Sequence, residues 1–461
     1  MRAARSHIRL ALTTVFLIVL TAVTYYLAEV LAVTGADTPS SPTENRLLKS
    51  ALEVGVDSPM DSPYATEVSE DIWILDELNA EDVAETGLFI WPERTLETLG
   101  NTELVYLARQ VDFVLRDTRD ERVRYILKRS NPGVRLIGYL NAMWTWTYDD
   151  HMWKWSEISH NPDWFLRDAQ GQRILSVCCG NPFNMDPGNI GWQEYLAEAA
   201  LRGVRNGLDG IYLDDVHQLV PTFYYQRGRW PINPRTGGRY SDDEWRAATL
   251  ELVQRVYARV RDYFPDPAHK LVLYNGTVGD GWERTTFMEF TDGGINEEFV
   301  HPYWRPAWEV RSEHRWKSEI DRLVSLQQQG KIILVIAGAA DGDQQAMNMF
   351  TYSSYLLGKG PNSFYNYNFP GLGSVGPLWP GFYVPIGSPI DEYYWSEGTY
   401  HRNYTGARVL VNPTDSPRQI DLGGPYYRLN NDGSVSLDTV DAIVLPPHMG
   451  AILLRVETYS Q

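Results

Sequence analysis

Short apolar runs alternate with longer stretches of helical periodicity through most of the chain. Eight runs have the length and composition of buried strands, at residues 87–91, 111–115, 135–140, 210–213, 271–274, 293–299, 331–337 and 363–367. Apolar residues recur at spacings of three and four between the runs, at residues 119–130, 192–206, 243–264, 313–329 and 344–357. This alternation predicts an α/β fold, a (β/α)8 TIM barrel over residues 72–396. A doubly wound open sheet is the alternative, but no glycine-rich phosphate-binding motif follows the first run.

The pattern changes after residue 396. Short strand-like runs occur at residues 407–411, 418–422, 426–429, 442–445 and 451–456. Turn-forming clusters separate them, including a Gly-Gly-Pro sequence at residues 423–425 and Asn-Asp-Gly at residues 431–433. Residues 397–461 are therefore predicted to form a small antiparallel β-domain docked on the barrel.

The N-terminal residues carry a targeting pattern. Three arginines and a histidine within the first nine residues precede an uncharged stretch at residues 10–28. That stretch is long enough to cross a bilayer and longer than most signal-peptide cores. Residues 1–33 are therefore predicted to be a signal anchor or a cleaved signal peptide, and residues 34–71, rich in Pro, Ser and Thr, a linker. Both possibilities place the rest of the chain outside the cytoplasm, membrane-anchored or secreted.

Composition narrows the possible ligands. Lys and Arg number 41 against 59 Asp and Glu, a net charge of −18, and no basic cluster is present. Such a chain is poorly suited to nucleic acid, which is bound through clustered basic residues. Two cysteines are too few for a disulfide scaffold or a cysteine-based zinc site, and we expect neither a metal nor a cofactor. Because 16 Trp and 28 Tyr are unusually many, they indicate either a sugar-binding site or a Trp-rich core.

Acidic residues follow the fourth and sixth predicted strands, where TIM barrels place their active sites. Alternation along residues 210–215 points Tyr212 and Asp214 toward the barrel axis if Ile211 and Leu213 face the helices. The sixth run contains Glu297 and Glu298. Glycosidic cleavage needs two such carboxyl groups, one ionised and one protonated. A Mg²⁺ site is the competing use of these acids, but it would require further carboxylates.

Four segments, taken in order, resemble a known family. They are NPDWFLRD at residues 161–168, MDP at 185–187, DGIYLDD at 209–215, and the stretch from Asp292-Gly293 to Glu297. Across residues 87–367 the chain resembles hypothetical glycosyl hydrolase family 15 and, distantly, endo-α-1,4-polygalactosaminidase barrels. The resemblance implies a nucleophilic Asp on strand four, matched by Asp214, and an acid/base Glu on strand six, matched by Glu297. Asp215 and Glu298 are the alternates, and Asn296 and Glu298 depart from the family pattern beside Glu297.

Aromatic and amide side chains at or after the other strand ends are candidate sugar contacts. They are Trp91, Tyr139, Asn141, Trp144, Trp146, Tyr212, His217, Asn275, Tyr303, Trp304 and Asn366. The adjacent Cys178 and Cys179 lie in the loop between strands three and four. In an exported chain they are expected either to form a strained disulfide, which would give a stiff apolar platform near the sugar site, or to remain as two buried thiols.

The sequence thus predicts an exported glycoside hydrolase that cleaves an extracellular or envelope polysaccharide or oligosaccharide with retention of configuration. Two alternatives stay open. One is a carbohydrate-binding barrel without turnover, and the other is a transglycosylase or scaffold in the assembly of envelope polysaccharide.

Overall fold

The computed structural model describes residues 87–90, 96–115, 120–150, 152–222, 225–226, 228–266, 270–276, 287–368 and 379–459. The predicted targeting segment at residues 1–33, the linker at 34–71 and Trp91 lie outside these residues. Within them, no helix combines the length and the apolar character needed to cross a membrane.

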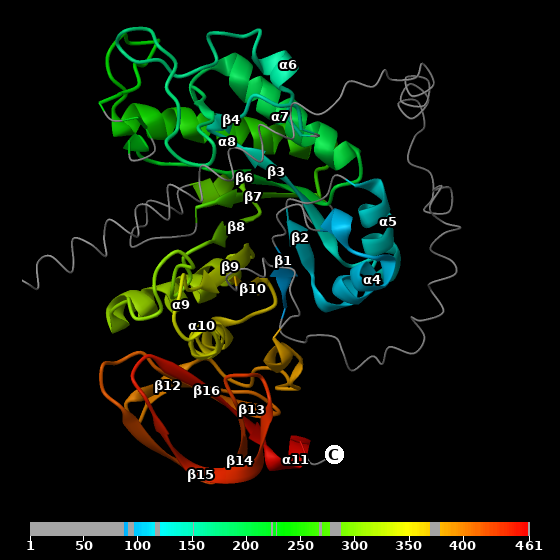
Figure 1. The fold of residues 1–461 in the computed structure, drawn as a ribbon, viewed down its shortest axis with the longest axis vertical. Helices are drawn as coiled ribbons and strands as arrows, with labels where there is room; N and C mark the ends of the chain where they lie inside the picture. The colour runs from blue at the N-terminus through cyan, green and yellow to red at the C-terminus, as the bar shows by residue number, and fades with distance from the viewer. Residues whose placement is uncertain are drawn as a thin grey trace, which may run out of the picture. The chain divides into compact units, whose positions relative to one another are not determined.

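Eight parallel strands form the central sheet (Figure 1). In spatial order they are β1 (Phe89–Ile90), β2 (Phe113–Leu115), β3 (Arg135–Asn141), β6 (Gly210–Asp214), β7 (Leu271–Asn275), β8 (Gly293–Asn296), β9 (Ile332–Gly338) and β10 (Ser363–Asn368). A parallel bridge between Leu88 and Tyr365 brings β1 beside β10, so the sheet curls into a nearly closed barrel. The predicted TIM-barrel architecture is confirmed, and each strand overlaps its predicted run.

Helices follow the strands as the apolar periodicity indicated. They are α5 (Glu121–Ser130), α7 (Ile190–Arg205), α8 (Asp242–Tyr263), α9 (Glu313–Gln328) and α10 (Gln344–Gly358). Side chains cap their first turns: Asp120 accepts from the Val123 amide, and Ser241 forms a capping box with Glu244. A further helix, α4 (Asn101–Gln110), was not predicted. The short elements α6 (Trp155–Ile158), β4 (Trp144–Thr145) and β5 (Phe183–Asn184) lie in the connection from β3 to α7.

The C-terminal sheet is antiparallel and has six strands. In spatial order they are β11 (Tyr394–Ser396), β12 (Thr399–Asn403), β13 (Ala407–Asn412), β16 (Met449–Arg455), β14 (Arg418–Leu429) and β15 (Val435–Leu445). The sheet encloses a small core of its own, and the Tyr404 hydroxyl donates to the Leu356 carbonyl of α10 at 2.6 Å.

Two details of this sheet differ from the prediction. The expected turn at residues 423–425 is wrong, because both flanking runs belong to the single strand β14. The Gly-Gly-Pro sequence is absorbed as an irregularity where the pairing with β15 shifts register between Asp421 and Tyr426. The sheet also begins at Tyr394, so the boundary drawn after Ser396 falls within the β11–β12 hairpin.

Candidate active site

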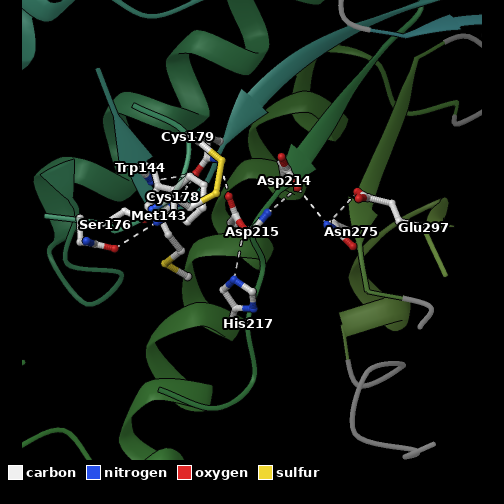
Figure 2. Close-up of polar contacts among 12 residues, drawn as sticks. Met143, Trp144, Ser176, Cys178, Cys179, Asp214, Asp215, His217, Asn275 and Glu297 are labelled. Atoms are coloured by element: carbon white, nitrogen blue, oxygen red, sulfur yellow. Dashed lines mark hydrogen bonds and ion pairs between the residues drawn. A yellow bond between two sulfur atoms is a disulfide. The ribbon is translucent and has the colours of Figure 1, made fainter. Parts of the chain in front are cut away.

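Asp214 and Glu297 lie on opposite sides of Asn275 at the carboxyl ends of β6, β7 and β8 (Figure 2). The Asn275 amide nitrogen donates to Asp214 Oδ1 at 2.9 Å and to Glu297 Oε1 at 3.0 Å. Because both oxygens contact the same nitrogen atom, they lie no farther apart than the sum of the two distances, about 5.9 Å. The two predicted acids therefore share one site.

Inward-facing tyrosines from two strands support Asp214 from below. The Tyr212 hydroxyl lies 3.2 Å from Asp214 Oδ1 and 3.0 Å from Glu297 Oε1, and the Tyr139 hydroxyl donates to Asp214 Oδ2 at 2.8 Å. The prediction that Tyr212 and Asp214 face the axis is confirmed. Burial first, and then the charges of Asp214 and Glu297, raise the pKa of Tyr212 well above its usual value. This hydroxyl therefore stays protonated and can donate to either carboxylate.

Donors converge on the Asp214 carboxylate. Besides Tyr139, Tyr212 and Asn275, the backbone amide of Asp215 donates to Asp214 Oδ1 at 2.8 Å. Hydrogen bonds to both carboxylate oxygens stabilise the ionised form, which a nucleophile requires.

Asp215 occupies a different position from its neighbour. Its backbone is left-handed, with φ of 54°, a conformation that Asp tolerates better than most residues. Its buried carboxylate accepts from the Asn141 amide at 2.6 Å and lies 3.2 Å from His217 Nε2. Asn141 also contacts the Tyr139 hydroxyl at 3.1 Å. Asp215 thus belongs to a hydrogen-bonded layer beside Asp214.

Glu298 takes part in a buried ionic network. Arg311 pairs with Glu298 at 2.8 Å and with Glu319 of α9, while the Asn296 amide donates to Glu319 at 2.8 Å. The two residues that flank Glu297 are therefore both tied to one network. Asn296, the last residue of β8, is anchored to α9, whereas the next residue, Glu297, contacts Tyr212 and Asn275 at the barrel mouth.

Arg311→Met should destabilise the protein by about 3–5 kcal/mol, because it removes the cation that forms an ion pair with the buried carboxylate of Glu319. Urea unfolding would measure the change. The matched control is Arg315→Met: this arginine is more exposed and lies 3.6 Å from Glu298, so its loss should cost less than about 1 kcal/mol. Equal losses in the two variants would show that the network does not hold this strand end.

An aromatic wall extends from Tyr139 to the cysteine loop. The Tyr139 and Trp153 ring centroids lie 6.4 Å apart, and those of Trp153 and Trp146 lie 5.7 Å apart. The Trp146 indole N–H donates to the carbonyl of Cys179 at 2.9 Å. Cys178 and Cys179 are joined as a disulfide, and Figure 2 draws the sulfur pair pointing toward Asp215. Sequence reasoning missed Trp153, which lies in an irregular segment far beyond the end of β3.

The remaining predicted contacts are dispersed. Trp144 is buried and donates to Asn184 at 3.0 Å, and Asn366 donates to the Phe89 carbonyl at 2.8 Å, joining β10 to β1. Both side chains are thus used in holding the scaffold. Tyr303 and Trp304 form an edge-to-face pair in the segment after β8, where Trp304 is half-exposed.

This chain matches the model of a known protein family. The model of the family described as hypothetical glycosyl hydrolase family 15 matches residues 128–408, which include Asp214, Glu297 and the whole site. A search of curated proteins finds no match.

Solved structures that this chain resembles include the following three. The glycoside hydrolase domain of PelA from Pseudomonas aeruginosa is 16% identical with a TM-score of 0.40, covering 64% of this chain and 97% of that one. The maltogenic α-amylase AmyB from Thermotoga neapolitana is 12% identical with a TM-score of 0.45, covering 82% and 100%. Amy13B from Eubacterium rectale is 11% identical with a TM-score of 0.46, covering 81% and 94%.

Proposed function

We propose that this chain, which belongs to hypothetical glycosyl hydrolase family 15 and is a glycoside hydrolase, cleaves a polysaccharide outside the cytoplasm with retention of configuration. The observation that carries the mechanism is the shared contact of Asn275 with both carboxylates. Retaining enzymes hold the two carboxyl groups about 5–5.5 Å apart, whereas inverting enzymes leave about 6.5–9.5 Å for a water molecule. The upper bound of about 5.9 Å between the two oxygens favours the shorter class.

Asp214 is the proposed nucleophile. Its carboxylate attacks the anomeric carbon, the bond to the leaving oxygen breaks, and a glycosyl ester of Asp214 forms. Tyr139, Asn275 and the Asp215 amide hold the attacking carboxylate in a fixed orientation. This preorganisation lowers the barrier because little rearrangement remains to be made on reaction.

Glu297 is the proposed acid and base. It gives its proton to the leaving oxygen in the first step, then takes a proton from the water that hydrolyses the ester. Tyr212 and Asn275 both contact Oε1, which holds the Glu297 carboxyl in one orientation beside Asp214.

Trp146 and His217 are proposed sugar contacts beside the acids. Trp146 is partly exposed above the wall formed with Trp153, which suits stacking on the apolar face of a sugar ring. His217 lies beside Asp215 and can bind a sugar hydroxyl.

A screen of soluble and insoluble polysaccharides against the protein tests this function directly. Release of reducing ends by the wild type, and its absence with Asp214→Asn, is the expected result. Binding without release would replace the hydrolase with a carbohydrate-binding barrel. Transfer of glycosyl units to sugar acceptors with no net hydrolysis would indicate a transglycosylase.

The location of the barrel is a separate prediction. Residues 1–33 carry the positively charged head and the apolar stretch of an export signal, so the barrel should lie on the outer side of the membrane. Protease added to intact cells that express the full chain should digest the barrel, while a cytoplasmic marker stays intact. Complete protection of the barrel until the cells are lysed would contradict export.

A further inference from the structure

A hollow borders the loop that carries the disulfide. It has a volume of about 650 Å³, within the range of small-molecule sites, and its lining includes Val177, Thr222, Tyr225, Gln226, Trp230 and Arg239. The lining combines the partly exposed indole ring of Trp230 with an amide, a hydroxyl and two guanidinium groups. Rings that stack on the apolar face of a sugar, beside donors and acceptors for its hydroxyls, are the usual components of a sugar-binding site.

Several contacts hold the walls of this hollow in place. The Trp230 indole N–H donates to the Tyr240 carbonyl at 3.1 Å, and the Arg239 guanidinium lies over the Trp230 ring at 5.7 Å from its centroid. On another wall, Arg229 forms an ion pair with the buried Asp168. The Trp230 ring is therefore fixed before any ligand arrives, which lowers the entropic cost of binding.

One lining residue is unsatisfied. Tyr225 is 4% exposed, and among the residues that the structure describes its hydroxyl has no hydrogen-bond partner. Burial, followed by the nearby Tyr240 and Asp186, raises the pKa of Tyr225 well above its usual value, so the hydroxyl stays protonated. Because this hydroxyl is itself buried, Tyr225 forms the base of the hollow, and the groups that a ligand can reach include the partly exposed Trp230 and Gln226.

The hollow and the catalytic site share one loop. Val177, which lines the hollow, directly precedes Cys178, and Ser176 pairs with Tyr225 through a backbone bridge. The following residue, Cys179, accepts from Trp146 on the side of the acids. The disulfide loop thus forms a ridge with the aromatic wall of the active site on one side and the hollow on the other.

We propose that the hollow is a second carbohydrate-binding subsite, which takes sugar units of the same chain that is cleaved between Asp214 and Glu297. This inference rests on the proposed function and extends it to the length of the substrate. A chain bound in both places must cross the disulfide ridge, so the preferred substrate is a polymer several sugars long, and a disaccharide would leave the hollow empty.

Trp230→Ala tests the inference on the polysaccharide that the screen identifies and on the shortest fragment of it that the enzyme cleaves. The variant should lower kcat/KM at least about tenfold on the polymer and less than about twofold on the short fragment, because only the polymer reaches Trp230. The matched control is Trp395→Ala, which removes a half-exposed tryptophan from the C-terminal sheet and should change neither value. An equal effect of Trp230→Ala on both substrates, or no effect, would overturn the subsite.

Thr222→Trp guards against a folding defect in the first variant. Thr222 is exposed, so a larger side chain there can fill the hollow without entering the core. It should reproduce the selective loss on the polymer while the melting temperature stays within a few degrees of the wild type. An unchanged polymer-to-fragment ratio in a folded Thr222→Trp variant would contradict the inference.

Binding separates this inference from the proposed function. The Asp214→Asn variant can be tested for binding to a panel of immobilised polysaccharides, because binding needs no turnover. If adding Trp230→Ala to this variant weakens its binding tenfold, the subsite is supported even if the wild type cleaves nothing. In that case only the hydrolase assignment fails. Cleavage of a polymer that neither Trp230→Ala nor Thr222→Trp affects would remove the subsite and leave the hydrolase intact.

Discussion

Asp214→Asn should lower kcat by at least about 10³-fold, equivalent to about 4 kcal/mol of lost transition-state stabilisation. The amide cannot attack the anomeric carbon as a carboxylate does, so no glycosyl ester forms. Its oxygen can still accept from Asn275 and from the Asp215 amide, while its nitrogen faces the Tyr139 hydroxyl, which can accept. Binding of the sugar should therefore stay within about threefold of the wild type, since the surrounding contacts survive. Steady-state kinetics and a direct binding assay on the same substrate would measure the two effects.

Asp215→Asn is the matched control for this prediction. The left-handed backbone at this position suits Asn as well as Asp, and the amide oxygen can still accept from Asn141. This variant should keep at least about a tenth of the wild-type kcat, because Asp215 orients its neighbours and does not touch the reacting carbon. An inactive Asp215→Asn beside an active Asp214→Asn would reverse the assignment within the hydrolase mechanism.

Glu297→Gln should have an effect that depends on the leaving group. Without a proton donor, hydrolysis of a natural glycosidic bond should slow by about 10²–10⁴-fold, the usual contribution of general acid catalysis. An aryl glycoside whose leaving group needs no protonation should form the glycosyl ester at a rate within about tenfold of the wild type. The Gln carbonyl can keep both contacts at the Oε1 position, so the change isolates the proton. The measurement is kcat/KM for a series of aryl glycosides, plotted against the pKa of the leaving phenol.

Glu298→Gln serves as the comparison for Glu297→Gln. Glu298 pairs with Arg311 on the helix side of β8, so its loss should affect stability and leave the dependence on the leaving group unchanged. A steep dependence on the leaving group in Glu298→Gln, with a flat one in Glu297→Gln, would identify Glu298 as the acid.

The retaining mechanism has a test of its own. Proton NMR of the first product formed by the wild type should show the anomeric configuration of the substrate, and the opposite configuration would exclude retention.

The sequence predicted the strand ends well because alternation along a buried strand has a fixed period of two. That rule was enough to predict that the side chains of Tyr212 and Asp214 point toward the barrel axis. It could not show that Tyr139 bonds to Asp214, because this depends on the register between β3 and β6, which pairs Tyr139 with Tyr212 and Asn141 with Asp214. Hydrogen-bond register between strands distant in sequence is set by the whole barrel.

Longer connections were harder to predict for a different reason. Trp153 and Trp230 lie in segments without a repeating pattern, and their positions depend on single contacts such as the Trp230–Tyr240 hydrogen bond. The role of Asn296 was also hidden, since its partner Glu319 lies on the next helix, 23 residues along the chain. The irregular pairing of β14 misled the prediction because Gly-Gly-Pro is typical of a turn.

The hydroxyl group of Tyr212 can donate its single proton to a different carboxylate in each half of the reaction. The hydroxyl oxygen lies 3.2 Å from Asp214 and 3.0 Å from Glu297, and one proton can point to only one of them at a time. Negative charge begins on Asp214 and passes to Glu297 once the glycosyl ester has formed and the acid has released its proton. Rotation about the C–O bond of Tyr212 lets the donor follow that charge, while the fixed amide of Asn275 serves both states. The two half-reactions can therefore use one rigid scaffold, with a hydroxyl rotor as the moving part.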